Sequence, residues 1–358
     1  MIIDYATLLI SFLGAAVTAG LIIVTGPLHW RFTHDVDFDS IQKYHLTPVP
    51  RIGGIALLVG LICGGIYHGL AADQELHLAK WAGVAAIPVF LGGILEDLKK
   101  GMTARDRLLL AFFSATIAHY ELHVGLERID WEWFDTVVIP APGVALLLTV
   151  LMVGGVSHAA NIIDGFNGLL LGVAIMALVA FVFVAQQVGA TLLVTYFSIM
   201  LGALLGVFVF NFPLGRIFLG DGGAYLIGFF LAILSLILVR NHIAVSPWFP
   251  LMLLAYPITE TIFSMFRKKV LSGVPAMAPD RLHFHMLVHE LIRQRSDEIS
   301  PKACNALTSI AMWGVFIVGL VPAVIWWQDT NKLVLGLLVY VGLYLISYFQ
   351  LRKLVLEQ

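Results

Sequence analysis

Carboxylate, amide and imidazole side chains gather at four places in a sequence that is otherwise strongly apolar. These places are LGGILEDLKKG with Glu96 and Asp97, NIIDGFNG with Asn161, Asp164 and Asn167, FLGDGGAYLIG with Asp221, and PDRLHFHM with His283 and His285. Carboxylates beside glycine-rich turns and a basic loop suit a divalent cation that bridges phosphate oxygens, because Mg²⁺ binds one or two carboxylates and completes its shell with water and substrate phosphate. Phosphoryl transfer needs mainly positioning and charge neutralisation. The residue types therefore indicate phosphate chemistry assisted by Mg²⁺.

Each of these groups also has a structural explanation. Asp164 and Asp221 precede predicted helices, where Asp is a good N-cap, so a capping role and a functional role both stay open for them. Asp97 ends a predicted helix, where a carboxylate faces the unfavourable end of the helix dipole, and this position favours a functional role. The two histidines are open to three interpretations: metal ligands, phosphate contacts or ordinary loop residues.

Spacing adds two further patterns. Asn161, Asp164 and Asn167 lie at i, i+3 and i+6, which predicts one polar helical face, either a recognition stripe or a polar seam between helices. Glycines flank Asp221 and would let the backbone approach a pyrophosphate closely near a helix N-terminus. The GxxxxGK[ST] pattern of an ATP-binding loop is absent from the sequence.

The elements that must position these groups are membrane spans. Of the 358 residues, 59% are hydrophobic and only 12% are charged, whereas soluble domains carry about 25% charged residues. We predict an all-α polytopic membrane protein with about 11 transmembrane helices, because about 20 apolar residues cross a bilayer. The predicted spans are 5–24, 52–71, 79–95, 106–123, 142–160, 166–185, 190–210, 222–239, 246–266, 303–327 and 333–350.

Basic residues predict the orientation of these spans. All of the 21 Lys and Arg residues fall in one set of alternating loops except Lys80, Arg128, Arg240 and Lys332. Because basic loops stay in the cytoplasm, we expect the N-terminus outside and the C-terminus inside. Within a single domain 1–358, cytoplasmic loops are then expected near 25–51, 96–106, 161–166, 211–221 and 267–302. All four polar groups come out on this face, which indicates one site.

Other classes of protein fit the sequence less well. An ion-coupled transporter is the alternative interpretation, but it predicts inverted repeats and carboxylates near the bilayer midplane, and we see neither. A CDP-alcohol phosphotransferase would have an Ala-Arg pair after Asp164-Gly165, and none follows. The net charge of −2 gives no indication of a nucleic-acid partner, and none is expected. Cys63 and Cys304 lie in or beside predicted helices and offer neither a disulfide framework nor a Cys-based metal site.

With PVPRIGG at 48–54 ahead of them, the motifs in this order resemble those of the polyprenyl-phosphate N-acetylhexosamine-1-phosphate transferase superfamily, over nearly the whole chain. DRLHFH is more similar to the branch that makes lipid-linked GlcNAc than to the MurNAc-pentapeptide branch. The resemblance implies transfer of a sugar 1-phosphate from a UDP-N-acetylhexosamine to undecaprenyl phosphate in the bacterial inner membrane, with release of UMP, to initiate a lipid-linked cell-surface glycan. It also implies Mg²⁺, with Mn²⁺ as an alternative ion, and leaves the sugar, the glycan and a homodimer open.

The motifs match functional positions of the family to particular residues of this sequence. The resemblance implies catalytic roles for Asp97, Asp164, Asp221, His283 and His285, with Asp221 as the metal ligand, and substrate-binding roles for Lys43, Asn161, Asn167, Arg281 and Glu96. Three positions depart from the family pattern: Glu96 replaces the first Asp of an acidic pair, Asn167 replaces the second Asp of DGxDG, and Met286 stands where HxHH has its third histidine. We expect a one-step transfer with Asp97 as a base or a positioning group, because an ionised phosphate is already a competent nucleophile.

Overall fold

The structure of the protein, a computed structural model, describes residues 4–35, 48–72, 77–99, 101–271, 273, 275, 280–295 and 299–356. In chain order the elements are α1 (Tyr5–Val24), α2 (Gly26–Thr33), β1 (His34–Asp35), β2 (Val49–Pro50), α3 (Gly53–Ala72), α4 (His77–Lys99), α5 (Ala104–Glu121), the π-helix η1 (Phe134–Val138), α6 (Val144–Ile163), α7 (Leu169–Gln187), α8 (Thr191–Asn211), α9 (Gly220–Asn241), α10 (Trp248–Leu253), α11 (Ala255–Phe266), the π-helix η2 (Arg267–Leu271), α12 (Phe284–Arg295), α13 (Pro301–Ile325) and α14 (Thr330–Leu356).

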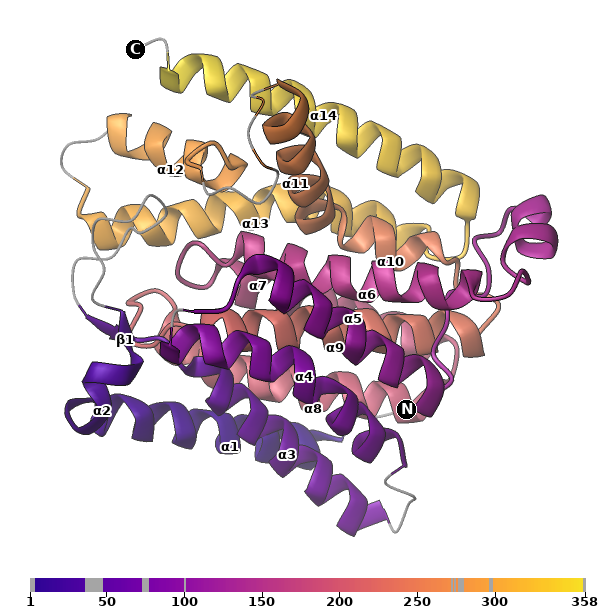
Figure 1. Ribbon diagram of the computed structural model, residues 1–358, viewed down its shortest axis with the longest axis horizontal. Helices are drawn as coiled ribbons and strands as arrows, with labels where there is room; N and C mark the ends of the chain where they lie inside the picture. The colour runs from indigo at the N-terminus through magenta and orange to yellow at the C-terminus, as the bar shows by residue number, and fades with distance from the viewer. Residues whose placement is uncertain are drawn as a thin grey trace.

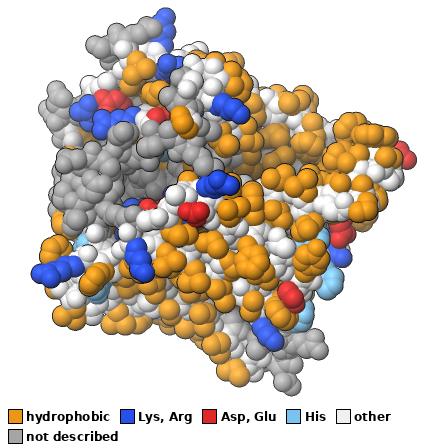
Figure 2. All heavy atoms as spheres, in the orientation of Figure 1, with side chains coloured by type: hydrophobic (Ala, Val, Ile, Leu, Met, Phe, Trp, Pro, Cys, Tyr) orange, Lys and Arg blue, Asp and Glu red, His pale blue; other side chains and the backbone are white. Residues whose placement is uncertain are grey.

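The long helices lie side by side in a bundle, and the two chain termini lie at opposite ends of it (Figure 1). The left end in this view, where α2, β1 and α12 lie, is called the site end, and the other is called the far end. Hydrophobic side chains cover most of the described surface in the same view, whereas Lys and Arg lie mainly toward the site end (Figure 2). This distribution is typical of a bundle that crosses a membrane.

Among the described residues, nine helices are long and apolar enough to cross a membrane. They correspond to nine of the eleven expected spans. The prediction of an all-α polytopic membrane protein is therefore confirmed, whereas the number of eleven spans stays a prediction.

The two remaining spans differ from these nine helices for separate reasons. Span 106–123 is α5, which carries Arg105, Asp106 and Arg107 in its first turn and Glu121 at its last residue. These four charged residues make α5 less apolar than the nine other long helices.

A proline interrupts the other remaining span, 246–266. The stretch folds as α10 and α11, and α10 ends at Leu253. Pro257 lies four residues beyond Leu253, and a proline ring clashes with the carbonyl four positions earlier and supplies no N–H. Pro257 is therefore a physical reason for the end of α10 at this point, although Pro88 in α4 and Pro322 in α13 are accommodated without a break.

Helix α9 forms the centre of the bundle. In its most apolar 18-residue window 89% of the residues are buried, against 22% in α1 and in α14, which lie on the outside. The polar first turn of α9 is therefore enclosed by other helices, and this enclosure places Asp221 inside the protein.

Two of the expected cytoplasmic loops contain secondary structure. The loop near 25–51 contains α2 and the antiparallel pair β1–β2, in which His34 pairs with Pro50. The loop near 267–302 contains the π-helix η2 and the helix α12. The short β pair brings the residue after β2, Arg51, back against α2, where its N–H donates to Thr33 O at 2.8 Å.

Candidate active site

The site is built where the start of α3, the end of α4 and the start of α9 meet. The N–H groups of Gly53 and Gly54 donate to Phe218 O at 2.9 Å and Leu219 O at 2.8 Å, and Phe218 N–H donates to Pro50 O at 2.9 Å. These backbone bonds hold the PVPRIGG segment directly against the turn that begins α9.

Two glycines let these elements come close enough. A Cβ added at Gly93 on α4 would lie 2.4 Å from the backbone N and Cα of Gly222, so no side chain fits there. Gly220 has φ +75°, and a Cβ there would lie 2.6 Å from Asp97 Oδ2. Both positions therefore require glycine, and the result is direct contact between the end of α4 and the start of α9.

Asp97 caps the N-terminus of α9 from a different helix. Its Oδ1 accepts from Asp221 N–H at 2.9 Å, and its Oδ2 accepts from Gly222 N–H at 3.0 Å. Arg51 Nε lies 3.2 Å from Oδ1, and the Asp97 carboxylate is fully shielded from solvent. The carboxylate at the unfavourable end of α4 thus lies at the favourable end of α9, where the exposed N–H groups and the helix dipole stabilise a negative charge.

Asp221 faces two arginines instead of capping its own helix. Arg51 Nη2 donates to Asp221 Oδ1 at 2.7 Å, and Arg107 Nη1 donates to Oδ2. The N-cap explanation for Asp221 therefore does not hold, because the cap is supplied by Asp97. Sequence reasoning missed both arginines as site residues, although Arg51 lies inside the PVPRIGG motif and Arg107 lies in the first turn of α5.

The NIIDGFNG turn lies beside this cluster. Helix α6 ends at Ile163, Asp164 follows as its C-cap residue, and α7 begins after Gly168. The single helical face expected for Asn161, Asp164 and Asn167 is therefore wrong, because the last two lie beyond the helix, and Asp164 caps no helix N-terminus. Burial and the nearby charge of Asp221 raise the pKa of Asp164 to about 7.

The two asparagines of this turn have different surroundings. Asn161 is half-buried on the last turn of α6, and its carbonyl accepts from Asp164 N–H at 3.2 Å. Asn167 Nδ2 donates to Pro213 O at 3.2 Å, and its N–H donates to Asn305 Oδ1 at 2.8 Å. In this conformation Asn167 therefore connects the turn to the segment before α9 and to α13.

The histidine segment lies against α11, at the N-terminus of α12. His283 Nδ1 lies 2.9 Å from Glu260 Oε1, and its Nε2 lies 3.6 Å from Asp280 Oδ1. Glu260 also accepts from Tyr344 Oη at 2.8 Å. Sequence reasoning missed Glu260, although a lone carboxylate in an apolar stretch is a signal of function. Both ring nitrogens of His283 thus face carboxylates, which fixes its ring.

His285 points toward the NIIDGFNG turn. Its Nδ1 lies 3.3 Å from Tyr256 Oη, and a Cβ added at Gly165 would lie 3.3 Å from its Nε2. This Nε2 is buried and has no hydrogen-bond partner in the described part of the chain. Burial lowers the pKa of His285 to about 4, so the ring is neutral near pH 7. The structure therefore brings His285 against Gly165, the residue that follows Asp164 in the NIIDGFNG turn.

The remaining predicted residues lie around this cluster or outside the description. Glu96 Oε2 accepts from Met102 N–H at 2.8 Å and so holds the connection between α4 and α5. Arg281 is exposed beside the histidine segment. Lys43 lies outside the described residues, so its role stays a prediction.

The cluster suits a metal ion that is completed by substrate. In the described ranges no three His, Cys, Asp or Glu side chains are arranged to hold a metal ion by themselves. Mg²⁺ needs only one or two carboxylates, because waters and substrate phosphates supply its other ligands. Asp221, with Asp164 nearby, fits that requirement.

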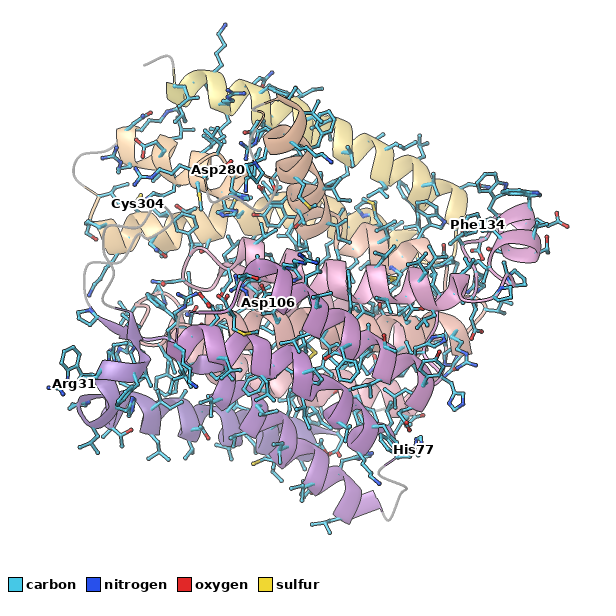
Figure 3. The ribbon with its side chains drawn as sticks, in the orientation of Figure 1. Arg31, His77, Asp106, Phe134, Asp280 and Cys304 are labelled. Atoms are coloured by element: carbon cyan, nitrogen blue, oxygen red, sulfur yellow. The ribbon has the colours of Figure 1, made fainter. Side chains whose placement is uncertain are left out.

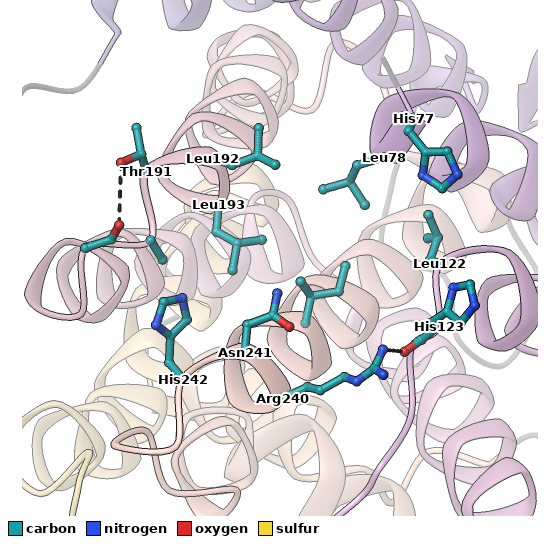
Figure 4. A pocket seen from close by; sticks show the side chains of 13 residues that line it. His77, Leu78, Leu122, His123, Thr191, Leu192, Leu193, Arg240, Asn241 and His242 are labelled. Atoms are coloured by element: carbon teal, nitrogen blue, oxygen red, sulfur yellow. Dashed lines mark hydrogen bonds between the residues drawn. The ribbon is translucent and has the colours of Figure 1, made fainter. Parts of the chain in front are cut away.

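The far end of the bundle carries a separate cavity of about 360 Å³ between the starts of α4 and α8 and the ends of α5 and α9. Figure 4 shows His77, His123, Arg240 and His242 around it, and no Asp or Glu lines it. His77 lies at the far end, whereas Asp280 and Cys304 lie toward the site end (Figure 3). The acidic cluster and this cavity are therefore at opposite ends of the spans.

Comparison with known proteins agrees with this geometry. The family described as glycosyl transferase family 4 matches residues 81–239. A probable undecaprenyl-phosphate N-acetylglucosaminyl 1-phosphate transferase of Bacillus subtilis is 29% identical over 259 residues, which cover 70% of this chain and 68% of the relative.

Two other relatives represent both branches of the superfamily. The undecaprenyl-phosphate alpha-N-acetylglucosaminyl 1-phosphate transferase of Salmonella typhi is 30% identical over 261 residues, 71% of this chain and 68% of the relative. A phospho-N-acetylmuramoyl-pentapeptide-transferase of Oceanobacillus iheyensis is 28% identical over 210 residues, 54% of this chain and 62% of the relative. The chain therefore belongs to glycosyl transferase family 4, the polyprenyl-phosphate N-acetylhexosamine-1-phosphate transferases.

Proposed function

We propose that the protein transfers N-acetylhexosamine 1-phosphate from a UDP-sugar to undecaprenyl phosphate, giving undecaprenyl-diphospho-sugar and UMP. The observation that carries the proposal is the enclosed cluster of Asp97, Asp164 and Asp221 with two arginines, at one end of the membrane spans. Two relatives whose names specify N-acetylglucosaminyl 1-phosphate transfer match over about 70% of this chain, so GlcNAc is the donor sugar we favour.

The arginines supply charge for the donor pyrophosphate. Arg107 uses Nη1 on Asp221, while its Nε is buried with no hydrogen-bond partner among the described residues. A guanidinium presents planar donors that match phosphate oxygens. Arg107 is therefore suited to bind one phosphate of the donor while it remains beside Asp221.

The carboxylates have separate tasks in this proposal. Asp221 would hold Mg²⁺, which supplies Lewis-acid stabilisation of the charge on the pyrophosphate oxygens. Asp97 holds the first turn of α9 and Arg51 in place, and both of its oxygens are already engaged. This engagement supports Asp97 as a positioning residue in a one-step attack by the lipid phosphate on the β-phosphate.

We also propose that the site end faces the cytoplasm. The clustering of basic residues at this end supports that orientation. The proposal includes Mg²⁺ as the ion, with Mn²⁺ as the alternative.

Cysteine labelling tests the orientation. In a chain with Cys63 and Cys304 replaced by Ser, single cysteines at exposed Gln187 and Asn331 should react with an impermeant maleimide in intact spheroplasts. A single cysteine at exposed Arg295 should react only after permeabilisation, because α12 lies at the site end. The reverse pattern would contradict the cytoplasmic orientation.

The reaction itself is tested by incubating purified protein with undecaprenyl phosphate, Mg²⁺ and a panel of UDP-sugars. UMP release should occur with a UDP-N-acetylhexosamine and depend on the lipid. An ion-coupled transporter would release no UMP with any donor, which separates the two functions.

A further inference from the structure

One histidine on α6 has no part in the site described so far. It lies about one helical turn deeper in the membrane span than Asn161. His158 is on α6, three residues before Asn161 and six before Asp164. At 1.5 Å per residue, it lies about 9 Å along the helix axis from Asp164. The polar side of α6 therefore continues below the turn that holds Asp164.

The surroundings of His158 connect it with the acidic cluster. Its ring lies edge-on to Tyr225 on α9, with centroids 4.8 Å apart. The guanidinium of Arg107 lies 5.8 Å from the centre of the same Tyr225 ring, and it bonds to Asp221. One aromatic ring thus separates His158 from the phosphate-binding arginine.

The outer ring nitrogen of His158 lacks a partner. Nε2 is buried and makes no hydrogen bond within the described parts of the chain, although the ring as a whole is only half-buried. Buried polar atoms are normally paired, because leaving one unpaired costs free energy. In an enclosure of α5, α6 and α9, a ligand is one way to satisfy this nitrogen.

A second histidine gives a direct comparison. His68 on α3 also has a buried Nε2 without a described partner and also lies edge-on to a tyrosine, Tyr196, at 6.1 Å. The carboxylate near His68 is Asp4, at the start of α1 and thus at the far end. An unpaired nitrogen alone therefore does not identify a site, whereas the proximity of His158 to Arg107 and Asp221 distinguishes it from His68.

The depth of His158 in the membrane span indicates which of the two substrates of the proposed reaction it contacts. A nucleotide sugar is water-soluble and reaches the cluster from the loops at the site end. The acceptor phosphate is attached to a hydrocarbon chain, so it approaches the cluster from the membrane, on the side where His158 lies deeper in the span than Asp164. A neutral imidazole can donate one N–H to a phosphate oxygen there.

We propose that His158 Nε2–H donates a hydrogen bond to the phosphate of the polyprenyl-phosphate acceptor, as a specificity residue for the lipid substrate. This assignment rests on the proposed function for its choice of ligand. It predicts an effect on lipid phosphate and none on the nucleotide.

The test is direct binding of geranylgeranyl phosphate and of UDP to purified protein, measured separately by microscale thermophoresis. His158→Phe should weaken binding of the lipid phosphate by roughly tenfold or more, as expected for a lost hydrogen bond to a charged group. UDP binding should be unchanged. His158→Gln, which keeps an N–H donor, should stay within about threefold of wild type, and the matched control His68→Phe should bind both ligands normally.

Steady-state kinetics then separates this inference from the proposed function. In an active enzyme, His158→Phe should raise the KM for undecaprenyl phosphate and leave the KM for the UDP-sugar unchanged. Unaltered lipid binding in His158→Phe, or an equal loss for UDP, would overturn the assignment. Wild-type protein that binds lipid phosphate through His158 but releases no UMP would instead refute the proposed function alone.

Discussion

Replacing Asp221 by Asn should lower turnover by more than about 100-fold, because even changes in the groups around metal ligands cost 10–100-fold. The side chain faces the two arginines and not the backbone of its own helix, so its negative charge has no capping task. Asn keeps the size and one acceptor oxygen but removes the charge that a hard cation requires. We expect the variant to fold, since Asp97 continues to cap α9.

Asp106→Asn is the matched control for this substitution. Asp106 also lies near the site end, but it is exposed and forms a capping box with Thr103 at the start of α5. Its loss should weaken this capping box, lower stability only slightly and leave turnover close to wild type. Turnover should be measured as UMP release, with thermal unfolding as the check on folding. Near-normal turnover in Asp221→Asn would return Asp221 to a structural role.

The second large effect concerns exchange of labelled UMP into UDP-sugar. With rigorously delipidated enzyme we expect no exchange, because one-step transfer forms no phospho-enzyme that UMP could attack. Exchange should appear when the lipid product is added, since the reverse reaction then becomes available. A covalent intermediate on Asp97 would instead allow exchange without lipid, as ping-pong behaviour requires.

The activity of Asp97→Asn does not show by itself whether Asp97 is a covalent nucleophile or a positioning residue. An amide has one acceptor oxygen, so either Asp221 N–H or Gly222 N–H would lose its partner, at a cost of about 1–3 kcal/mol. Turnover should therefore fall even if Asp97 only positions α9. Robust lipid-free exchange in wild type that disappears in Asp97→Asn would refute the one-step mechanism and identify Asp97 as the nucleophile.

Much of the arrangement could be predicted from sequence because hydrophobicity and charge determine it. The apolar runs predicted the long spans, and alternate loops brought Asp97, Asp164 and Asp221 to one end, where the structure also has them. The break between α10 and α11 was not predictable in the same way: Pro257 stands four residues after the last residue of α10, but Pro88 and Pro322 lie inside the continuous helices α4 and α13.

The pairing of side chains could not be predicted in the same way. Arg51 and Asp221 are 170 residues apart, and their ion pair depends on the close contact of three helix ends. The capping role that local sequence suggests for Asp221 belongs to Asp97, 124 residues earlier, because α4 delivers its carboxylate to the start of α9. Local patterns identify which residues can cap or bind, whereas the partner depends on tertiary packing.

The most direct test of sugar 1-phosphate transfer follows the β-phosphate of the donor. Purified protein is incubated with undecaprenyl phosphate, Mg²⁺ and UDP-GlcNAc labelled with ³²P at the β-phosphate, and the lipid and aqueous fractions are counted. The proposed reaction moves the label into the lipid fraction and leaves unlabelled UMP in water. Label that remains in the aqueous phase as UDP, or no transfer with any UDP-N-acetylhexosamine, would contradict it.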